Sequence, residues 1–158
     1  MKNRIIIIVD VLIIILFIVL LLTNCSMKLT PTYAPTRFGD QDLLSPEDVS
    51  ELTVHSIKIK RGQFDFSVTN NGTQVWEIGA HNILESYIDG QWMQLQMLDN
   101  WVFTDDLYSI EAGQTFGGAF SLKMYGLRKL PEGDYRLIVS IASAGEALQP
   151  LAVPFTIS

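Results

Sequence analysis

The chain has 158 residues, of which 48% are hydrophobic. This length accommodates one domain of about 100–120 residues and an N-terminal appendage. The formal net charge of −6 at pH 7 argues against binding to nucleic acid and against electrostatic attraction to anionic lipid. The single cysteine, Cys25, excludes an intramolecular disulfide.

The first 25 residues indicate a signal peptide or a membrane anchor. Lys2 and Arg4 form a short basic start, and Ile5–Leu22 is apolar apart from Asp10. As a helix, these positions would rise roughly 27 Å, which is close to the thickness of a bilayer core. Because the basic residues flank the run on its cytoplasmic side, the positive-inside rule places the remainder of the chain outside the cytoplasm.

Two interpretations of this segment remain open, and both give the same topology. Leu22-Thr23-Asn24-Cys25 resembles the lipobox of bacterial lipoproteins, in which the cysteine is acylated, although Asn24 stands where a smaller residue is usual. The alternative is an uncleaved signal anchor, which the length of the apolar run favours. We expect the membrane as a partner, through lipid on Cys25 or an N-terminal hydrophobic helix, with the domain on the extracytoplasmic side of the cell membrane.

The next stretch has the composition of a flexible tether. Pro31, Pro35 and Pro46 are separated by Thr, Ser and acidic residues. The pattern then changes to one typical of strands. The predicted divisions are a signal peptide or anchor, a tether and one domain, at residues 1–25, 26–51 and 52–158.

The predicted domain has a hydrophobic period of two, which is typical of β-strands. Phe64, Phe66 and Val68 alternate with polar residues and are expected on one buried face. Asp89-Gly90, between two strand-like runs, predicts a hairpin turn with positive φ at both residues. The predicted strands are 54–60, 64–69, 76–78, 82–88, 91–98, 115–123, 130–141 and 151–157. This pattern, with no long helical period, predicts an all-β antiparallel sandwich of seven to eight strands.

Tyr135 follows a turn that contains Pro131 and Gly133, and it begins a strand with apolar residues at alternate positions. A tyrosine placed in this way can bury its ring and donate its hydroxyl to a nearby backbone group. That arrangement is the tyrosine corner of immunoglobulin-like sandwiches.

Three further features concern the predicted sheets. Gly117-Gly118 predicts a β-bulge. Pro154 predicts that the last strand lies at a sheet edge, because proline cannot donate to the hydrogen-bond ladder. Glu85 and Arg136 are expected to meet across a sheet as a structural charge pair.

Four sequence blocks follow one another in this domain, at 66–71 (FSVTNN), 84–92 (LESYIDGQW), 108–113 (YSIEAG) and 130–136 (LPEGDYR). In order and spacing they resemble the bacterial immunoglobulin-like domains of short extracytoplasmic proteins. The resemblance implies a non-enzymatic sandwich, often on a membrane-anchored or lipidated protein, and it offers no catalytic residues to transfer.

The chain offers little for catalysis or metal binding. His55 and His81 are predicted to lie on exposed strand faces, and two isolated histidines do not make a zinc site. Asp99, Asp105 and Asp106 are grouped, but they lack the order of a calcium loop and are predicted to be solvated. We therefore expect that the protein is not an enzyme and that it has no catalytic residue, no metal site and no cofactor.

Trp92, Trp101 and Tyr108 are the main candidate binding residues, and Trp76 and Tyr87 are further aromatic candidates. Trp92 follows the predicted hairpin turn, and Trp101 and Tyr108 lie in a stretch without regular periodicity. Exposed aromatic side chains there would form a binding patch for a protein or a cell-wall glycan.

The expected function is a membrane-anchored extracytoplasmic binding or structural module without catalytic activity. One alternative is an inhibitor or accessory subunit of a cell-surface enzyme, presenting Asp99–Tyr108 to that enzyme. A further alternative is an enzyme acting on glycan with Glu85 or Asp105 as the acid, which would need a second carboxylate within about 5–10 Å.

Overall fold

The computed structural model describes residues 30–158, apart from residues 56 and 100. Within this part of the chain, Pro31–Ser158 form a compact unit. The predicted hydrophobic helix, the lipobox-like motif and Cys25 lie outside the described residues. Among the residues that are described, no helix combines the length and the hydropathy needed to span a membrane.

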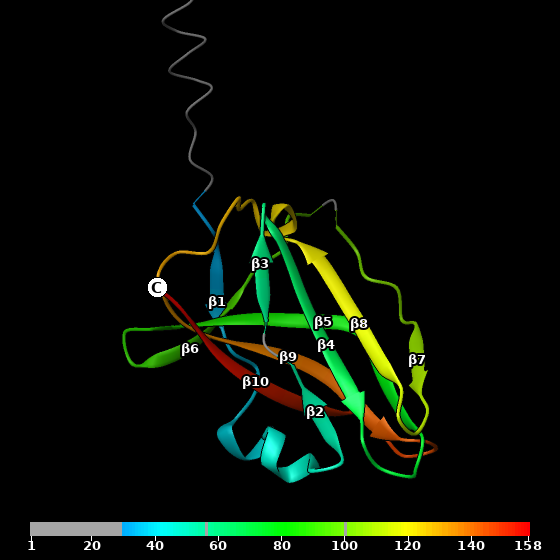
Figure 1. Cartoon of the computed structure of the whole chain (residues 1–158). Coiled ribbons are helices and arrows are strands. Elements are labelled where there is room, and N and C mark those ends of the chain that lie inside the picture. Colours follow the sequence, from blue (N-terminus) through cyan, green and yellow to red (C-terminus); the bar gives the residue numbers. More distant parts are fainter. Residues whose placement is uncertain (1–29, 56, 100) are drawn as a thin grey trace, which may run out of the picture. The chain divides into compact units, whose positions relative to one another are not determined.

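The described chain is built from strands, as predicted, with ten strands and three short 3-10 helices (Figure 1). In chain order the elements are β1 (Tyr33–Pro35), η1 (Asp40–Asp42), η2 (Pro46–Val49), β2 (Leu52–Val54), β3 (Lys58–Lys60), β4 (Gln63–Asn70), β5 (Trp76–Ile88), β6 (Gln91–Leu95), β7 (Leu107–Ile110), β8 (Thr115–Ser121), η3 (Leu122–Tyr125), β9 (Gly133–Ser143) and β10 (Gln149–Ile157). The count exceeds the expected seven to eight strands because β1 and β7 were not predicted. In addition, the predicted strand 54–60 is divided between β2 and β3, while the predicted strands 76–78 and 82–88 are joined in β5.

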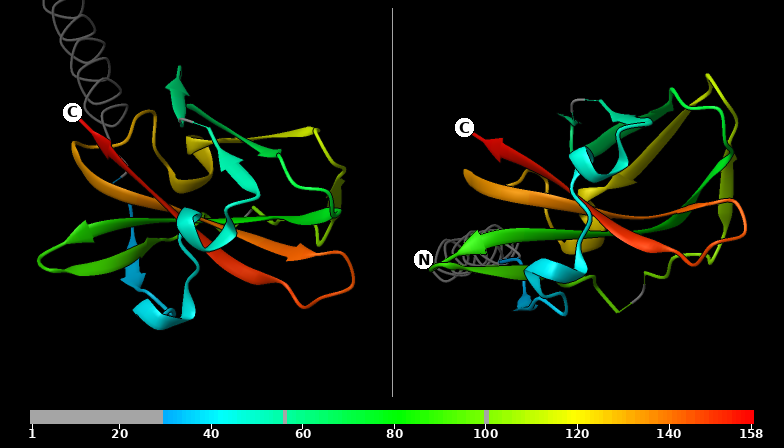
Figure 2. Two further views of the ribbon diagram at one scale, coloured as in Figure 1. Left: turned by 60° about the horizontal axis from the view of Figure 1, so that its bottom comes forward. Right: turned by 90° about the horizontal axis from the view of Figure 1, so that it is seen from below.

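Two antiparallel sheets form the two layers seen in Figure 2. The six-stranded sheet has the order β1-β6-β5-β9-β10, and β7 also pairs with β5. The four-stranded sheet has the order β2-β4-β3, and β8 also pairs with β4. This arrangement is consistent with the predicted immunoglobulin-like sandwich.

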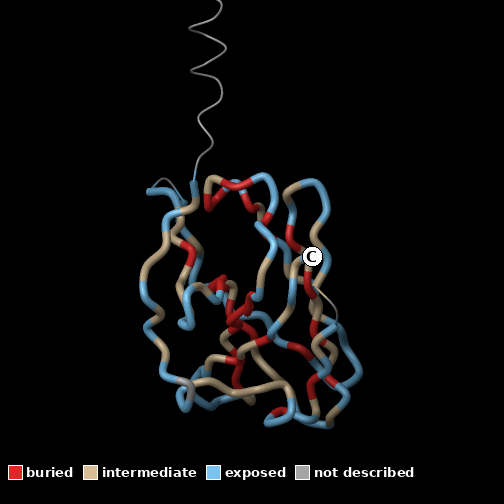
Figure 3. The backbone as a smooth tube through the Cα atoms, turned by 90° about the vertical axis from the view of Figure 1, so that its left-hand side faces the viewer, coloured by how far each residue is buried: buried red, intermediate tan, exposed pale blue. Residues whose placement is uncertain are grey.

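The core contains side chains from both sheets. Phe64, Phe66 and Val68 of β4 are buried, as their alternation predicts, and Leu84 and Leu137 come from the six-stranded sheet. Figure 3 shows the buried positions as separate red stretches along the strands. Each fully buried side chain of this size stabilises the fold by about 1.5–3 kcal/mol relative to an exposed one.

The predicted tyrosine corner is present. Tyr135 is buried, and its hydroxyl donates a hydrogen bond to the Pro131 carbonyl oxygen at 3.0 Å. Burial raises the pKa of this tyrosine, so the hydroxyl keeps the proton that it donates. The corner therefore fixes the point where the chain enters β9.

The turn between β5 and β6 also agrees with the prediction, with φ of 50° at Asp89 and 85° at Gly90. The predicted bulge at Gly117-Gly118 was wrong, because the register between β4 and β8 runs without a shift. Gly118 instead lies against the Phe66 ring, which a Cβ atom at this position would overlap. The bulge-like irregularity occurs in β5, between Ile78 and Asn82.

Residues 31–51 differ from the flexible tether that the sequence predicts. They belong to the compact unit, and β1 pairs with β6 through Tyr33 opposite Leu95. β1 is the edge strand of the six-stranded sheet beside β6, and in both views of Figure 2 the blue stretch around η1 lies on the side of that sheet away from the four-stranded sheet. Residues 31–45, called the cover segment below, are therefore part of the folded domain.

The cover segment ends beside β10, the edge strand of the six-stranded sheet. Leu44 forms a parallel bridge with Leu151, through its amide to the Pro150 carbonyl at 2.9 Å and its carbonyl to the Ala152 amide at 2.8 Å. Farther along β10, Pro154 has no amide hydrogen to offer, in agreement with the predicted edge position. The edge of β10 is thus partly covered and partly unable to pair.

Candidate binding site

The outer face of the six-stranded sheet, turned away from the core, carries side chains that are nevertheless buried. Successive side chains of a strand point to opposite faces, and Leu84 and Leu137 belong to the core. Their neighbours Glu85 and Arg136 therefore lie on the outer face, with only 0% and 6% exposure. The cover segment contributes to this burial, because Thr36 contacts Glu85 directly.

Glu85 on β5 and Arg136 on β9 are direct cross-strand partners. Arg136 Nε donates to Glu85 Oε2 at 2.7 Å, and Arg136 Nη2 lies 2.7 Å from the same oxygen. The other carboxylate oxygen, Oε1, accepts a hydrogen bond from Thr36 Oγ1 at 2.5 Å. The predicted charge pair is confirmed, and it is a buried pair with both carboxylate oxygens engaged.

Trp92 on β6 completes this cluster. The Arg136 guanidinium lies over the Trp92 ring, 4.3 Å from its centroid, and the Tyr87 ring lies 5.1 Å away at an angle of 58°. The Trp92 carbonyl also accepts the Thr36 amide hydrogen at 3.3 Å. The indole is therefore held by a cation, a neighbouring ring and the cover segment.

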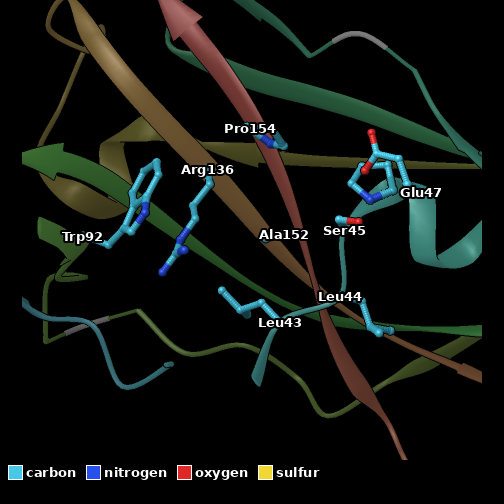
Figure 4. Close-up of a pocket in the computed structure, with 9 residues that line it drawn as sticks. Leu43, Leu44, Ser45, Glu47, Trp92, Arg136, Ala152 and Pro154 are labelled. Carbon is cyan, nitrogen blue, oxygen red and sulfur yellow. The ribbon is translucent and has the colours of Figure 1, made fainter. Parts of the chain in front are cut away.

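A hollow of about 310 Å³ lies between the end of the cover segment and the outer face (Figure 4). In Figure 4 the Arg136 side chain extends between Trp92 and Leu43. The lining residues are mainly apolar, with Glu47 at one side, and comprise Leu43, Leu44, Ser45, Pro46, Glu47, Trp92, Arg136, Ala152 and Pro154. We call this the first hollow.

A second hollow, also of about 310 Å³, shares Trp92 and Pro154 with the first. Its lining consists of Tyr87, Trp92, Asp134, Tyr135, Pro154, Phe155 and Thr156. The Asp134 carboxylate accepts a hydrogen bond from Thr156 Oγ1 at 2.8 Å. Because the two hollows share these two lining residues, we name the pair the Trp92 groove.

The structure does not bring the three predicted aromatic residues into one patch. Trp92 lies near the end of β5 that pairs with β6, whereas Tyr108 lies on β7, which pairs with the opposite end of β5. Tyr108 packs against Phe116, with 5.3 Å between ring centroids. Trp101 is 40% exposed in the stretch between β6 and β7. Only Trp92 contributes to the groove.

Tyr87, one of the further aromatic candidates, lies opposite Trp92 because of the two-residue hairpin loop at Asp89-Gly90. Sequence reasoning missed Thr36 and Leu43 as members of this site. Thr36 and Leu43 carry no local signal, since their role depends on a sheet that forms from residues far along the chain.

A second surface feature is the stretch of residues 98–108, called the 98–108 segment below. It holds five of the seven large hydrophobic residues that are exposed in the described chain: Leu98, Trp101, Val102, Leu107 and Tyr108. Asp99, Asp105 and Asp106 in the same stretch are exposed as well, as predicted. This surface is therefore both apolar and acidic.

The two histidines lie at the surface of the domain. His55 and His81 are both exposed, and His55 Nε2 lies 2.7 Å from Thr69 Oγ1. Partial burial lowers the pKa of His81, with a further contribution from the positive charge of Arg37. Within the described residues, no group of three or more His, Cys, Asp or Glu side chains could hold a metal ion.

Comparison with solved structures gives weak likenesses. The chain is similar to a structural-genomics target, SoR45, at 12% identity and a TM-score of 0.43, covering 68% of this chain and 86% of that one. It is also similar to part of a β-glucosidase involved in saponin metabolism from intestinal bacteria, at 15% identity and a TM-score of 0.32. A β-glucosidase from Listeria innocua in complex with isofagomine gives the same identity and TM-score.

Each β-glucosidase match covers 68% of this chain but only 16% of the enzyme chain. Likenesses of this strength carry no information about function. A search of curated proteins found no match.

The sequence model of one family, described as "Bacterial Ig-like domain", matches residues 47–155. This range covers most of the chain and nearly all of both sheets, while the cover segment precedes it. The all-β architecture and the tyrosine corner agree with this match. The chain therefore belongs to the family of bacterial Ig-like domains.

Proposed function

We propose that this protein is a membrane-anchored module on the extracytoplasmic side of a bacterial cell membrane, where its Ig-like domain binds another molecule. Membership of the family indicates a non-catalytic binding or structural module. The Trp92 groove supplies a place for binding, since its lining is largely apolar with a few polar groups.

The anchoring part of the proposal rests on the N-terminal sequence up to Cys25. Ile5–Leu22 is an apolar run behind the basic residues Lys2 and Arg4, and the single cysteine of the chain, Cys25, follows directly. A run of this length suits a signal anchor, and a cysteine in this place suits lipidation. Either route would leave the domain on the outer side of the membrane.

Mass spectrometry of the mature N-terminus, together with protease treatment of intact cells, tests this proposal. We expect either a diacylglycerol adduct on Cys25 or an intact Met1 in the membrane fraction, with the domain cleaved by external protease. A Cys25→Ser variant should lose the diacylglycerol adduct in the first case, and in the second it should differ from wild type only by the mass of the substitution. Recovery of the full chain in the cytoplasmic fraction would refute the proposal.

A second candidate function is favoured by the 98–108 segment. Clusters of exposed apolar residues mark interaction surfaces, and this cluster is accompanied by three exposed carboxylates. It suits an accessory subunit or inhibitor that docks on an apolar, positively charged surface of a cell-surface enzyme.

Crosslinking and pulldown from detergent-solubilised membranes test this second candidate. Co-purification of a hydrolase with the wild-type chain, and its loss from a Trp101→Ser, Leu107→Ser double variant, would support the accessory role. Recovery of the same hydrolase with the double variant would contradict it.

A further inference from the structure

We propose that the Trp92 groove binds a neutral glycan, which stacks on Tyr87 and donates hydroxyl hydrogen bonds to Asp134 and Glu47. The inference rests on the proposed role as a binding module, and it adds the chemical class of the ligand. It does not depend on how the chain is anchored.

The groove has room for more than one sugar unit. Its two hollows are each about 310 Å³, and Trp92 and Pro154 line both. The volume of each lies at the lower end of the range for small-molecule sites. A chain of linked rings would therefore use both hollows, and an oligosaccharide should bind more tightly than a monosaccharide.

Tyr87 provides the stacking surface. Its side chain is 48% exposed, and it lines the second hollow beside Trp92. Trp92 itself is covered by the Arg136 guanidinium, so it acts as a fixed wall against which Tyr87 packs. An aromatic ring held in place in this way loses little conformational freedom when a ligand covers it.

The carboxylates of the groove, on Glu47 and Asp134, are hydrogen-bond acceptors. The Asp134 carboxylate has about four lone-pair positions, of which Thr156 uses one. Glu47 is exposed at the side of the first hollow. Hydroxyl groups of a ligand can donate to both carboxylates while its C–H faces cover the apolar walls.

Charge excludes an anionic ligand. Among the described residues that line the groove, Arg136 is the one cationic side chain, and it is buried against Glu85. The remaining charged side chains of the lining, Glu47 and Asp134, are negative. The ligand is therefore neutral or cationic, and a neutral glycan matches both the apolar walls and the hydroxyl acceptors.

NMR titration of the purified full-length protein in detergent tests the proposal, with the indole N–H signals of its three tryptophans as reporters. The probes are neutral tetrasaccharides of glucose, N-acetylglucosamine, galactose and mannose, the corresponding monosaccharides, and a proline- and arginine-rich decapeptide. We expect at least one tetrasaccharide to shift the Trp92 signal in a saturable manner. The Trp101 signal serves as an internal control and should stay in place.

Variants then separate stacking from folding. Tyr87→Ala should weaken tetrasaccharide binding by about tenfold, whereas Tyr87→Phe keeps the ring and should bind nearly as well as wild type. Leu107→Ala is the matched control, because Leu107 is similarly exposed at 51% but lies outside the groove. The amide spectrum of each variant reports whether the fold is retained.

The proposal is overturned if no tetrasaccharide shifts the Trp92 signal, or if the peptide alone does so, which would make the groove a peptide site. Equal binding by Tyr87→Ala and wild type would also overturn it. The N-terminal analysis is independent of these results, so a failure of glycan binding remains distinguishable from a failure of membrane anchoring.

Discussion

The sequences of the cover segment and the 98–108 segment share one property, which is that neither shows the regular periodicity of a strand or a helix. In the folded domain they differ sharply. The cover segment adds β1 to one edge of the six-stranded sheet, bonds through Thr36 to Glu85 on its outer face, and bridges through Leu44 to Leu151 at its other edge. The 98–108 segment leaves most of its large apolar side chains in solvent.

The difference comes from the partners that each segment meets. The cover segment faces a buried carboxylate and a strand edge, and both require hydrogen bonds that it supplies. The 98–108 segment is held near its ends, through the Leu98 amide to the Met124 carbonyl and the Ala80 amide to the Asp106 carbonyl. Phe103 packs on His81 and Tyr108 packs on Phe116, whereas Leu98, Trp101, Val102 and Leu107 are exposed. An irregular segment is thus part of the folded structure where it meets groups that need hydrogen bonds. Where it meets few such groups, its side chains stay exposed and available for binding.

The largest expected effect comes from Glu85→Ala, which removes the buried carboxylate that accepts a hydrogen bond from Thr36 of the cover segment. Arg136 would then keep a buried charge without its carboxylate partner, and the free energy of unfolding should fall by about 3–5 kcal/mol. Urea unfolding of the purified domain measures this change. A Glu85→Leu, Arg136→Met double variant should recover much of the loss, since it removes both charges. A loss below about 1 kcal/mol for the single variant would contradict the buried pair.

A smaller effect is expected when the cover segment alone is altered. Thr36→Val removes the hydroxyl that donates to Glu85 Oε1 and should lower the free energy of unfolding by about 1.5–3 kcal/mol. Thr32→Val is the matched control, because Thr32 is exposed and contributes its carbonyl to the sheet. Equal effects of the two substitutions in urea unfolding would show that the cover segment does not stabilise the ion pair.

The 98–108 segment should respond much less. Trp101→Ser and Leu107→Ser alter side chains that are 40% and 51% exposed, so each should change the free energy of unfolding by no more than about 0.5 kcal/mol. Thermal and urea unfolding of both variants provide the measurement. Losses as large as that of Thr36→Val would remove the distinction between the two segments.

The smallest effect concerns Asp48, just beyond the cover segment. Hydrogen bonds from the Ser45 amide and hydroxyl lower the pKa of this carboxyl below 3.8. A lowered pKa in the folded state stabilises the fold above the unfolded-state pKa, and this contribution is lost as the pH falls through the folded-state pKa. Asp48→Asn should therefore be slightly less stable than wild type at neutral pH, and the difference in urea midpoint should vanish in strong acid. A difference that is independent of pH would rule out this linkage.

Local signals in the sequence were sufficient for the sandwich. The alternation around Phe66, the hairpin turn at Asp89-Gly90 and the corner at Tyr135 each depend on residues within a few positions of one another. The cross-strand pair of Glu85 and Arg136 was also predicted, because both lie in strands with clear periodicity. These features follow from local backbone preferences and side-chain alternation.

The groove could be predicted only in part. Trp92 was identified because it follows a hairpin turn, but the residues of the cover segment were assigned to a tether. Their composition, rich in proline and polar residues, does suit a flexible chain. What orders them is a set of hydrogen bonds to residues such as Glu85, 49 positions away from Thr36 in the chain, and no local pattern encodes such contacts.

The distance in sequence between Thr36 and Glu85 has a consequence for biosynthesis. The ribosome makes the chain from the N-terminus, so the stretch around Thr36 emerges well before β5 and β9, the strands on which it will rest. Arg136 is a further 51 positions beyond Glu85. The outer side of the sandwich therefore cannot close before Arg136 has been synthesised, and until then the stretch around Thr36 lacks the ion pair on which it will rest.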